Sequence, residues 1–286
     1  ILSLRLPLPM TKRRTNRRVN EARDGQYSAG RGGDWHSGRV CRAGVLHPAA
    51  GDIAIMQYMG GKARIATDIA NTLNACKPVN YYEPFCGGLW VSQHVIADHL
   101  YLSDASEPLI ALYKAMREGW VPPSKVTEGD YKHYQSLKDS KDPMTGFVGY
   151  GCSFSGKYFG GYARSGARNY ALNAKNSLLR KFKALRDKQV TFTAHDYARV
   201  MPSGGGVVYC DPPYQGTTGY AIAPDFHWAG FWAWVKERSQ AAKIFTSSYE
   251  APHGFWPILT IPTKTDMHTK HGKEARAERV FIWHPM

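Results

Sequence analysis

Apolar positions recur with helical or strand spacing from about residue 56 to the end of the chain. Ile65, Ile69 and Leu73 share one face of a helix, whereas the run Val207-Val208-Tyr209-Cys210 is typical of a buried strand. The pattern predicts helices over residues 63–75, 89–97, 108–117 and 173–185, and strands over residues 80–85, 100–104, 190–194, 206–210, 243–247, 257–261 and 279–283. Strands that alternate with helices indicate an α/β fold with a mostly parallel sheet, helices on both faces and an antiparallel pair at the end.

The start of the chain lacks this pattern. Residues 1–55 contain a basic run from Lys12 to Arg18 and a glycine-rich run from Gly30 to Gly38, so we predict a disordered basic extension. It is a candidate nucleic-acid-binding tail. It could equally be a solvated tail without function, or upstream sequence joined to a core that begins near Met56.

A second stretch interrupts the alternation within the core. Residues 119–188 are rich in Lys, Arg, Tyr, Gly and Ser, and they close with the predicted helix over residues 173–185. We therefore predict one α/β domain made of residues 56–118 and 189–286, with residues 119–188 as an inserted region.

The composition fits a globular protein with a sizeable core, since 43% of its 286 residues are hydrophobic and 21% are charged. A formal net charge of +14 favours a polyanionic partner, and nucleic acid is a commoner partner than an acidic membrane surface. No apolar stretch is long enough to span a bilayer, and the apolar start precedes its basic cluster, the reverse of a secretory signal. We therefore expect a cytoplasmic protein with no membrane partner.

The cysteines argue against a disulfide framework and against a zinc site, because their number is odd and no Cys-x-x-Cys pair occurs. They are Cys41, Cys76, Cys86, Cys152 and Cys210. His268 and His271 lack a supporting third ligand, so no metal is expected.

The tetrapeptide Asp211-Pro212-Pro213-Tyr214 directly follows the buried strand that ends at Cys210. An amino group conjugated to a heteroaromatic ring is a poor nucleophile, so a site that alkylates it must accept hydrogen bonds from its N–H groups. Asp211 and the Pro212 carbonyl can accept them, the two prolines stiffen the turn, and Tyr214 offers a face on which a base can stack. The plainer interpretation is an ordinary strand-end turn. The tetrapeptide favours a methyltransferase that acts on a nucleobase.

Two further strand ends carry residues suited to a cofactor. The pair Gly87-Gly88 follows a predicted strand, and paired glycines let the backbone approach a ligand closely. Asp104 ends the next strand, where an acidic side chain can accept hydrogen bonds from ribose hydroxyls. Taken singly, the glycines are also typical of turns, and Asp104 of a helix N-cap.

Four motifs occur in the order seen in Dam-like (D12 class) adenine-specific DNA methyltransferases. They are Tyr58-Met59-Gly60-Gly61-Lys62, Tyr82-Glu83-Pro84-Phe85-Cys86-Gly87-Gly88, Leu102-Ser103-Asp104 and Asp211-Pro212-Pro213-Tyr214. The resemblance covers nearly all of the chain after Met56, and phage-borne adenine methylases are especially similar. The chain departs from the family at Leu89-Trp90, where the glycine turn usually has a further small residue.

The resemblance implies a Rossmann-like class I fold, S-adenosylmethionine as methyl donor and adenine N6 in DNA as acceptor. It assigns the cofactor to Tyr58, Lys62, Phe85, Gly87, Asp104, Asp196 and Asp211, and the target base to Asp211, Pro212, Pro213 and Tyr214. It also implies a base flipped out of the duplex, and no covalent enzyme intermediate, so Cys86 and Cys210 are expected to be packing residues.

The inserted region, residues 119–188, would then recognise the DNA target. Five basic residues are candidates for phosphate contacts, namely Lys157, Arg164, Arg168, Lys270 and Lys273. Each of them could also be a solvated surface charge. We expect a monomer or weak dimer, from an orphan, phage-protective or restriction-modification context.

Two alternatives remain open. The same amine chemistry would serve cytosine N4 or an RNA base, although Asp rather than Ser at position 211 favours adenine by the resemblance. A DNA-binding protein that keeps the fold without catalysis is the other alternative. The intact Lys62, Asp104 and tetrapeptide argue against it.

Overall fold

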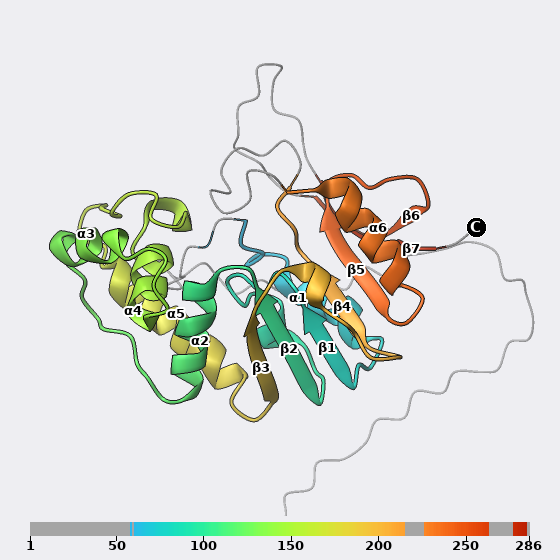
Figure 1. The fold of residues 1–286 in the computed structure, drawn as a ribbon, viewed down its shortest axis with the longest axis horizontal. Coiled ribbons are helices and arrows are strands. Elements are labelled where there is room, and N and C mark those ends of the chain that lie inside the picture. The colour runs from blue at the N-terminus through green and yellow to red at the C-terminus, as the bar shows by residue number, and fades with distance from the viewer. Residues whose placement is uncertain (1–57, 59, 215–225, 263–276, 285–286) are drawn as a thin grey trace, which may run out of the picture. The chain divides into compact units, whose positions relative to one another are not determined.

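A seven-stranded sheet organises the part of the chain that this computed structural model describes, which is residues 58, 60–214, 226–262 and 277–284 (Figure 1). Its strands are β1 (Asn80–Glu83), β2 (His99–Asp104), β3 (Gln189–Ala194), β4 (Val207–Cys210), β5 (Lys243–Ser248), β6 (Phe255–Pro262) and β7 (Ala277–Trp283). The strand order is β3-β2-β1-β4-β5-β7-β6. Only β7 among them runs antiparallel to its neighbours β5 and β6. The predicted α/β class, with a mostly parallel sheet and an antiparallel pair at the end, is confirmed.

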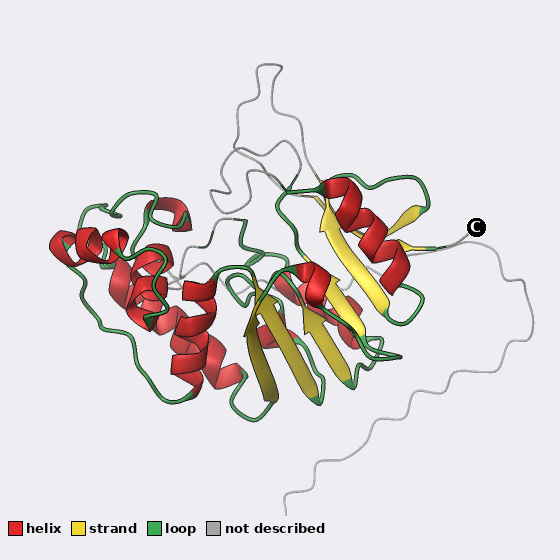
Figure 2. Ribbon diagram, viewed as in Figure 1, coloured by secondary structure: helices red, strands yellow, loops and turns green. Residues whose placement is uncertain are grey.

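Helices flank this sheet and fill the interruption between β2 and β3 (Figure 2). They are α1 (Ala66–Asn74), α2 (Glu107–Arg117), α3 (Glu128–Ser136), α4 (Pro143–Gly146), α5 (Tyr170–Ala184) and α6 (Trp228–Arg238). Short turns add the 3-10 segments η1 (Ser92–His94), η3 (Phe154–Gly156) and η4 (Tyr197–Arg199), and the π-helical segment η2 (Phe147–Gly151). The helix α6 was not among the predicted helices.

The two faces of the sheet pack against different helices because side chains alternate along each strand. In β4, Val207 and Tyr209 point to the face covered by α1, α2 and α5, whereas Val208 and Cys210 point to the face covered by α6. Tyr81 and Tyr82 of β1 divide in the same way. Burial on both faces explains why β4 is apolar at every position.

The helix predicted over residues 89–97 is wrong, since only Ser92–His94 form a single 3-10 turn. Leu89 has a φ of +56°, which an α-helix does not admit. Side chains from other elements take the backbone groups that a helix would use. Lys188 Nζ donates to Val95 O at 2.7 Å, and the Ile96 N–H donates to Asn74 Oδ1 at 2.8 Å. Tertiary hydrogen bonds therefore replace the helical ladder here.

Residues 119–188 have helical structure beyond the one predicted helix. Thr127 caps α3 through a capping box with Asp130, and Asn169 caps α5, which starts earlier than the predicted residue 173. The segments α4 and η2 pack against α2 of the main domain. In the described part of the chain, no helix has both the length and the apolar character needed to cross a membrane.

Candidate active site

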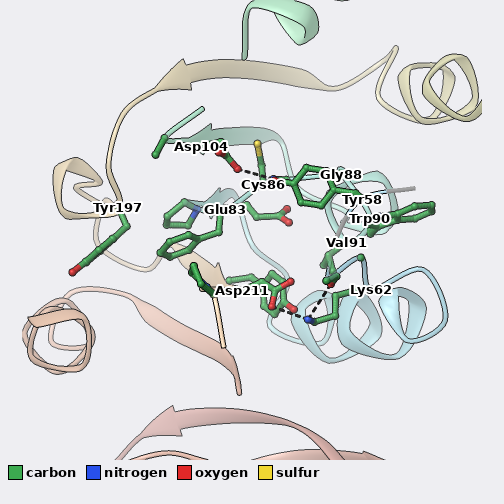
Figure 3. Close-up of a pocket in the computed structure, with 18 of the residues that line it drawn as sticks. Tyr58, Lys62, Glu83, Cys86, Gly88, Trp90, Val91, Asp104, Tyr197 and Asp211 are labelled. Carbon is green, nitrogen blue, oxygen red and sulfur yellow. Dashed lines mark hydrogen bonds and ion pairs between the residues drawn. The ribbon is translucent and has the colours of Figure 1, made fainter. Parts of the chain in front are cut away.

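A cavity of about 490 Å³ lies at the carboxyl ends of β1, β2, β3 and β4 (Figure 3). The strand order reverses between β1 and β4, and ligands of open α/β sheets bind at such a switch point. The volume is in the usual range for a small-molecule site. All the residues predicted to hold the cofactor line the cavity, namely Tyr58, Lys62, Phe85, Gly87, Asp104, Asp196 and Asp211.

The loop after β1 turns at Gly87, whose φ of +40° lies in the left-handed region. A Cβ at this position would lie 2.8 Å from Cε1 of Tyr58, so the glycine lets the tyrosine ring pack directly on the loop. The Gly87 N–H donates to Asp104 Oδ2 at 3.1 Å, and the Gly87 carbonyl accepts from the Tyr113 hydroxyl at 2.5 Å. Both backbone groups of the turn are therefore held by side chains.

Asp104 at the end of β2 organises the neighbouring backbone. Besides the Gly87 N–H, its carboxylate accepts the Ser106 N–H at 3.0 Å. Burial raises the pKa of Asp104, and the two hydrogen bonds oppose that shift. Each carboxylate oxygen has more than one lone pair, so Asp104 can still accept hydroxyl groups from a ligand.

Asp211 directly follows β4 and forms a buried ion pair. Lys62 Nζ lies 2.8 Å from Asp211 Oδ1 and 3.6 Å from Glu278 Oε1, with the lysine side chain 8% exposed. Burial opposes the charge of Lys62, but Asp211 and Glu278 outweigh burial and raise its pKa. Burial raises the pKa of Asp211, and Lys62 acts against that shift. The lysine thus holds Oδ1 of the carboxylate in place, and a hydrogen bond from Tyr214 also opposes the rise in the pKa of Asp211.

Tyr214 lies beside this ion pair. Its hydroxyl donates to Glu278, and its ring centroid lies 4.5 Å from Lys62 Nζ. Tyr249 packs edge-on against the same ring at 4.7 Å. Asp211 and Pro213 line the cavity, whereas Pro212 and Tyr214 lie outside its lining.

Aromatic rings form one wall of the cavity. Phe85 stacks on Tyr197 with centroids 5.6 Å apart, and Phe226 meets Phe85 edge-on at 6.0 Å. Asp196 lies at the same wall and caps η4 by accepting the Ala198 N–H at 2.8 Å. A flat apolar surface beside a carboxylate suits a heteroaromatic ring that carries an amine.

Several lining or supporting residues were missed from the sequence. Glu83 lines the cavity at 3% exposure and accepts the Tyr81 hydroxyl at 2.9 Å. Burial, together with the charge of Asp211, raises the pKa of Glu83 to about 8. Its place inside the second motif was an available signal. Glu278 had none, because only the antiparallel β7 brings it to Lys62.

The predicted DNA-contacting residues lie apart from the cavity lining. Arg164 is exposed and pairs with Glu128, Arg168 is exposed beside the Tyr170 ring, and Lys157 is half-buried. Lys270 and Lys273 lie outside the described residues, as do residues 1–55, His268 and His271. Within the described ranges, no three His, Cys, Asp or Glu side chains form a group that could hold a metal.

The cavity fits a cationic nucleoside. The carboxyl groups of Glu83 and Asp104 suit hydroxyl groups, the Asp211 carboxylate suits positive charge, and the aromatic wall suits a base. Gly87 lets the Tyr58 ring pack directly on the loop, so that both residues line the cavity. These are the groups that S-adenosylmethionine requires.

The sheet order and this site define the class of the protein as an S-adenosylmethionine-dependent methyltransferase of Rossmann-like fold. A family model described as D12 class N6 adenine-specific DNA methyltransferase matches residues 58–148. The chain is 26% identical over 204 residues to DNA adenine methylase of Escherichia coli (strain K12), an alignment that covers 62% of this chain and 70% of that protein. The protein of the same name from Escherichia coli O157:H7 matches equally well. These comparisons confirm the resemblance that the motifs indicated: the chain is similar to D12 class N6 adenine-specific DNA methyltransferases.

Solved structures give more distant matches. The rRNA methyltransferase aviRa from Streptomyces viridochromogenes is 13% identical with a TM-score of 0.40, and the alignment covers 82% of this chain and 90% of that chain. Magnesium protoporphyrin IX methyltransferase (ChlM) from Synechocystis PCC 6803, with bound SAM, is 11% identical with a TM-score of 0.36, covering 79% and 81%. Matches at this distance do not bear on the substrate of this chain.

Proposed function

We propose that this protein transfers the methyl group of S-adenosylmethionine to N6 of adenine in DNA, at a base held outside the duplex. The observation that carries the proposal is the position of Asp211, which shares one cavity with Gly87 and Asp104 and forms an ion pair with Lys62. The family match over residues 58–148 and the methylase relatives support adenine in DNA as the acceptor.

The chemistry requires the amine and the methyl donor to meet in line. When bound, S-adenosylmethionine supplies a methyl group on a sulfonium centre. Asp211 Oδ2 accepts one N–H of the amine and the Pro212 carbonyl accepts the other, which draws the nitrogen lone pair out of the ring. Lys62 holds the carboxylate in one orientation through Oδ1. The nitrogen loses its extra proton after transfer, and we propose Asp211 as the acceptor.

Tyr214 would stack on the flipped adenine. In this structure its hydroxyl is bonded to Glu278 and its ring packs beside Lys62, on the inner side of the turn. Stacking therefore requires the ring to leave these contacts. A base that enters the site would replace the edge-on contact with Tyr249 by a face-to-face contact.

Flipping a base costs a few kcal/mol, which phosphate contacts can offset. We propose that Lys157, Arg164 and Arg168 make such contacts, with Lys270 and Lys273 as further candidates. Arg168→Ala is expected to raise the KM for DNA and to reduce the salt dependence of binding by about one phosphate contact. Arg186→Ala, an exposed arginine that also belongs to residues 119–188, is the control. Equal effects of Arg168→Ala and Arg186→Ala would contradict the proposed phosphate contact of Arg168.

The activity is tested by incubating the purified protein with labelled S-adenosylmethionine and unmethylated DNA, then digesting the DNA to nucleosides. We expect N6-methyldeoxyadenosine, and about a hundredfold loss of kcat in Asp211→Asn. Asp187→Asn, a change at an exposed aspartate, should leave the rate unchanged. Label found in N4-methylcytosine, or in RNA offered as substrate, would show that the acceptor is not adenine N6 in DNA. Cofactor binding without transfer would indicate a silent DNA-binding protein.

A DNA substrate would place the protein in the cytoplasm of a bacterial or phage-infected cell, acting as a monomer or weak dimer. Cell fractionation tests the location. Sedimentation of the purified protein, alone and with DNA, tests the oligomeric state.

A further inference from the structure

Lys181 is a buried lysine whose ammonium group lies behind the cofactor loop. It belongs to the last turn of α5, within the inserted region, and is 2% exposed. Its Nζ donates to the Gly88 carbonyl and lies 3.4 Å from the centroid of the Trp90 ring. Among the described residues, none of the ion pairs includes Lys181.

The loop from Cys86 to Trp90 has its backbone held by side chains from three different elements. Asp104 at the end of β2 accepts the Gly87 N–H, and Tyr113 of α2 donates to the Gly87 carbonyl. Lys181 donates to the next carbonyl, that of Gly88. A buried carbonyl without a donor is costly, so each of these contacts stabilises one path of the loop.

Trp90 extends the same contact to the cavity wall. A Cβ at Gly61 or at Gly88 would lie 2.7 Å from the indole Nε1, so the indole edge packs on the backbone of both glycines. Gly61, Gly88 and Trp90 all line the cavity. Lys181 therefore contacts two lining residues directly, through the Gly88 carbonyl and the Trp90 ring. Through the same ring it also supports the backbone at Gly61. Trp90 belongs to the pair Leu89-Trp90, at which the chain departs from the family that it resembles.

We propose that Lys181 is a positioning residue for the cofactor, whose charge fixes Gly88 and Trp90 and thereby the wall on which S-adenosylmethionine binds. The inference rests on the proposed function. It means that the inserted region contributes to cofactor binding as well as to DNA recognition. Lys181 does not line the cavity, so it acts only through the loop.

The burial of this cation opposes folding. Burial, together with the neighbouring charge of Arg180, lowers the pKa of Lys181 to about 7. A buried charge without a carboxylate partner is seldom a source of stability, and an apolar side chain of similar length is often tolerated equally well. A role in stability alone predicts that removing the charge weakens the fold. A role in positioning predicts a loss of cofactor affinity without that weakening.

The test is Lys181→Met, with Lys183→Met as control because Lys183 is an exposed lysine of the same helix. Cofactor affinity is measured by calorimetry, stability by urea unfolding without cofactor, and KM for each substrate by methyl transfer. We expect at least about fivefold weaker cofactor binding, a matching rise in the KM for cofactor, and unfolding no easier than in the unmutated protein. Affinity within about twofold of the control would overturn the proposal, as would a loss of affinity accompanied by easier unfolding.

A second variant covers the case in which Lys181→Met does not fold. Lys181→Gln keeps a donor but no cation, and it should also bind the cofactor less well, whereas normal affinity would overturn the role of the charge. In the double variant with Trp90→Leu, the two losses should not add, since both act on one wall. Additive losses of affinity would contradict the proposal that Lys181 acts on the cofactor through Trp90. Failure of the unmutated protein to bind S-adenosylmethionine would refute the proposed function itself, a different outcome.

Discussion

Replacing Lys62 by Met should show how strongly one cation stabilises the two carboxylates beside it. Its Nζ lies 2.8 Å from Asp211 and 3.6 Å from Glu278, and its side chain is buried. Met has a similar length and no charge, so the change removes the ion pairs with little effect on packing. The variant leaves two buried carboxylates facing one another without a counter-ion.

The magnitude follows from these distances. At an effective dielectric constant of about 20, attraction at 2.8 Å is roughly 6 kcal/mol and attraction at 3.6 Å is roughly 5 kcal/mol. Desolvation of the charged groups offsets much of this, so we expect Lys62→Met to lower the free energy of unfolding by about 3–5 kcal/mol at pH 8. The difference in free energy of unfolding between Lys62→Met and the unmutated protein should become smaller toward pH 5.5. Without the lysine, burial and mutual repulsion raise the pKa values of Asp211 and Glu278 further, and the folded state then retains a proton that the unfolded chain has released.

The assay is urea unfolding at pH 8 and at pH 5.5. Lys132→Met is the control, because that lysine is 72% exposed and its pair with Glu128 is a surface contact expected to contribute less than about 1 kcal/mol. Equal stability of Lys62→Met and the unmutated protein at pH 8 would refute the reasoning. So would a deficit that stays the same at both pH values, because the remaining carboxylates would then not be taking up a proton.

Three further predictions concern single side chains of the site. Because the pKa of Glu83 is raised to about 8 from its usual 4.5, stability should fall by up to about 1.4 kcal/mol per pH unit as pH rises through that window, and Glu83→Gln should flatten the slope in urea unfolding. Gly87→Ala should weaken cofactor binding more than tenfold by calorimetry, as a rough expectation, because φ is +40° and the new Cβ would lie 2.8 Å from an aromatic carbon, while Gly166→Ala, with φ +50° and open space, should not. Tyr214→Phe loses the contact with Glu278 but keeps the stacking face, so kcat should stay within about threefold, and a loss as large as that of Tyr214→Ala would contradict the stacking role.

The sequence predicted the parts of the fold and site that local pattern controls. The continuous apolar run of β4, the helical face of α1 and the glycine turn at Gly87 are all visible in short windows. Each motif residue assigned to the cofactor lines the cavity, because the carboxyl ends of parallel strands meet at one edge of the sheet.

The missed features depend on contacts between distant segments. The helix predicted over residues 89–97 fails because Lys188 and Asn74 take its backbone groups, and neither residue is near it in sequence. Glu278 belongs to a strand that reads as an ordinary amphipathic segment, and its partner Lys62 lies at the other end of the described chain. The contacts of Lys181 are equally hidden in the sequence of α5: its spacing from Ala174 and Leu178 places it on the buried face, but it does not show that Gly88 and Trp90 lie there. Propensity and periodicity do not report such pairings.

The contact between Lys62 and Glu278 also bears on when the site can form during synthesis. Lys62 precedes α1, whereas Glu278 lies in β7, the last strand of the chain, and β7 inserts between β5 and β6. A ribosome-bound chain that lacks β7 can already contain Gly87, Asp104 and Asp211, but its lysine has only one of its two carboxylates. Closing a contact over nearly the whole chain is a late and slow step of folding. A nascent chain would therefore carry the cofactor loop before Lys62 has its second carboxylate, so the ion-paired site is completed only after β7 has been synthesised.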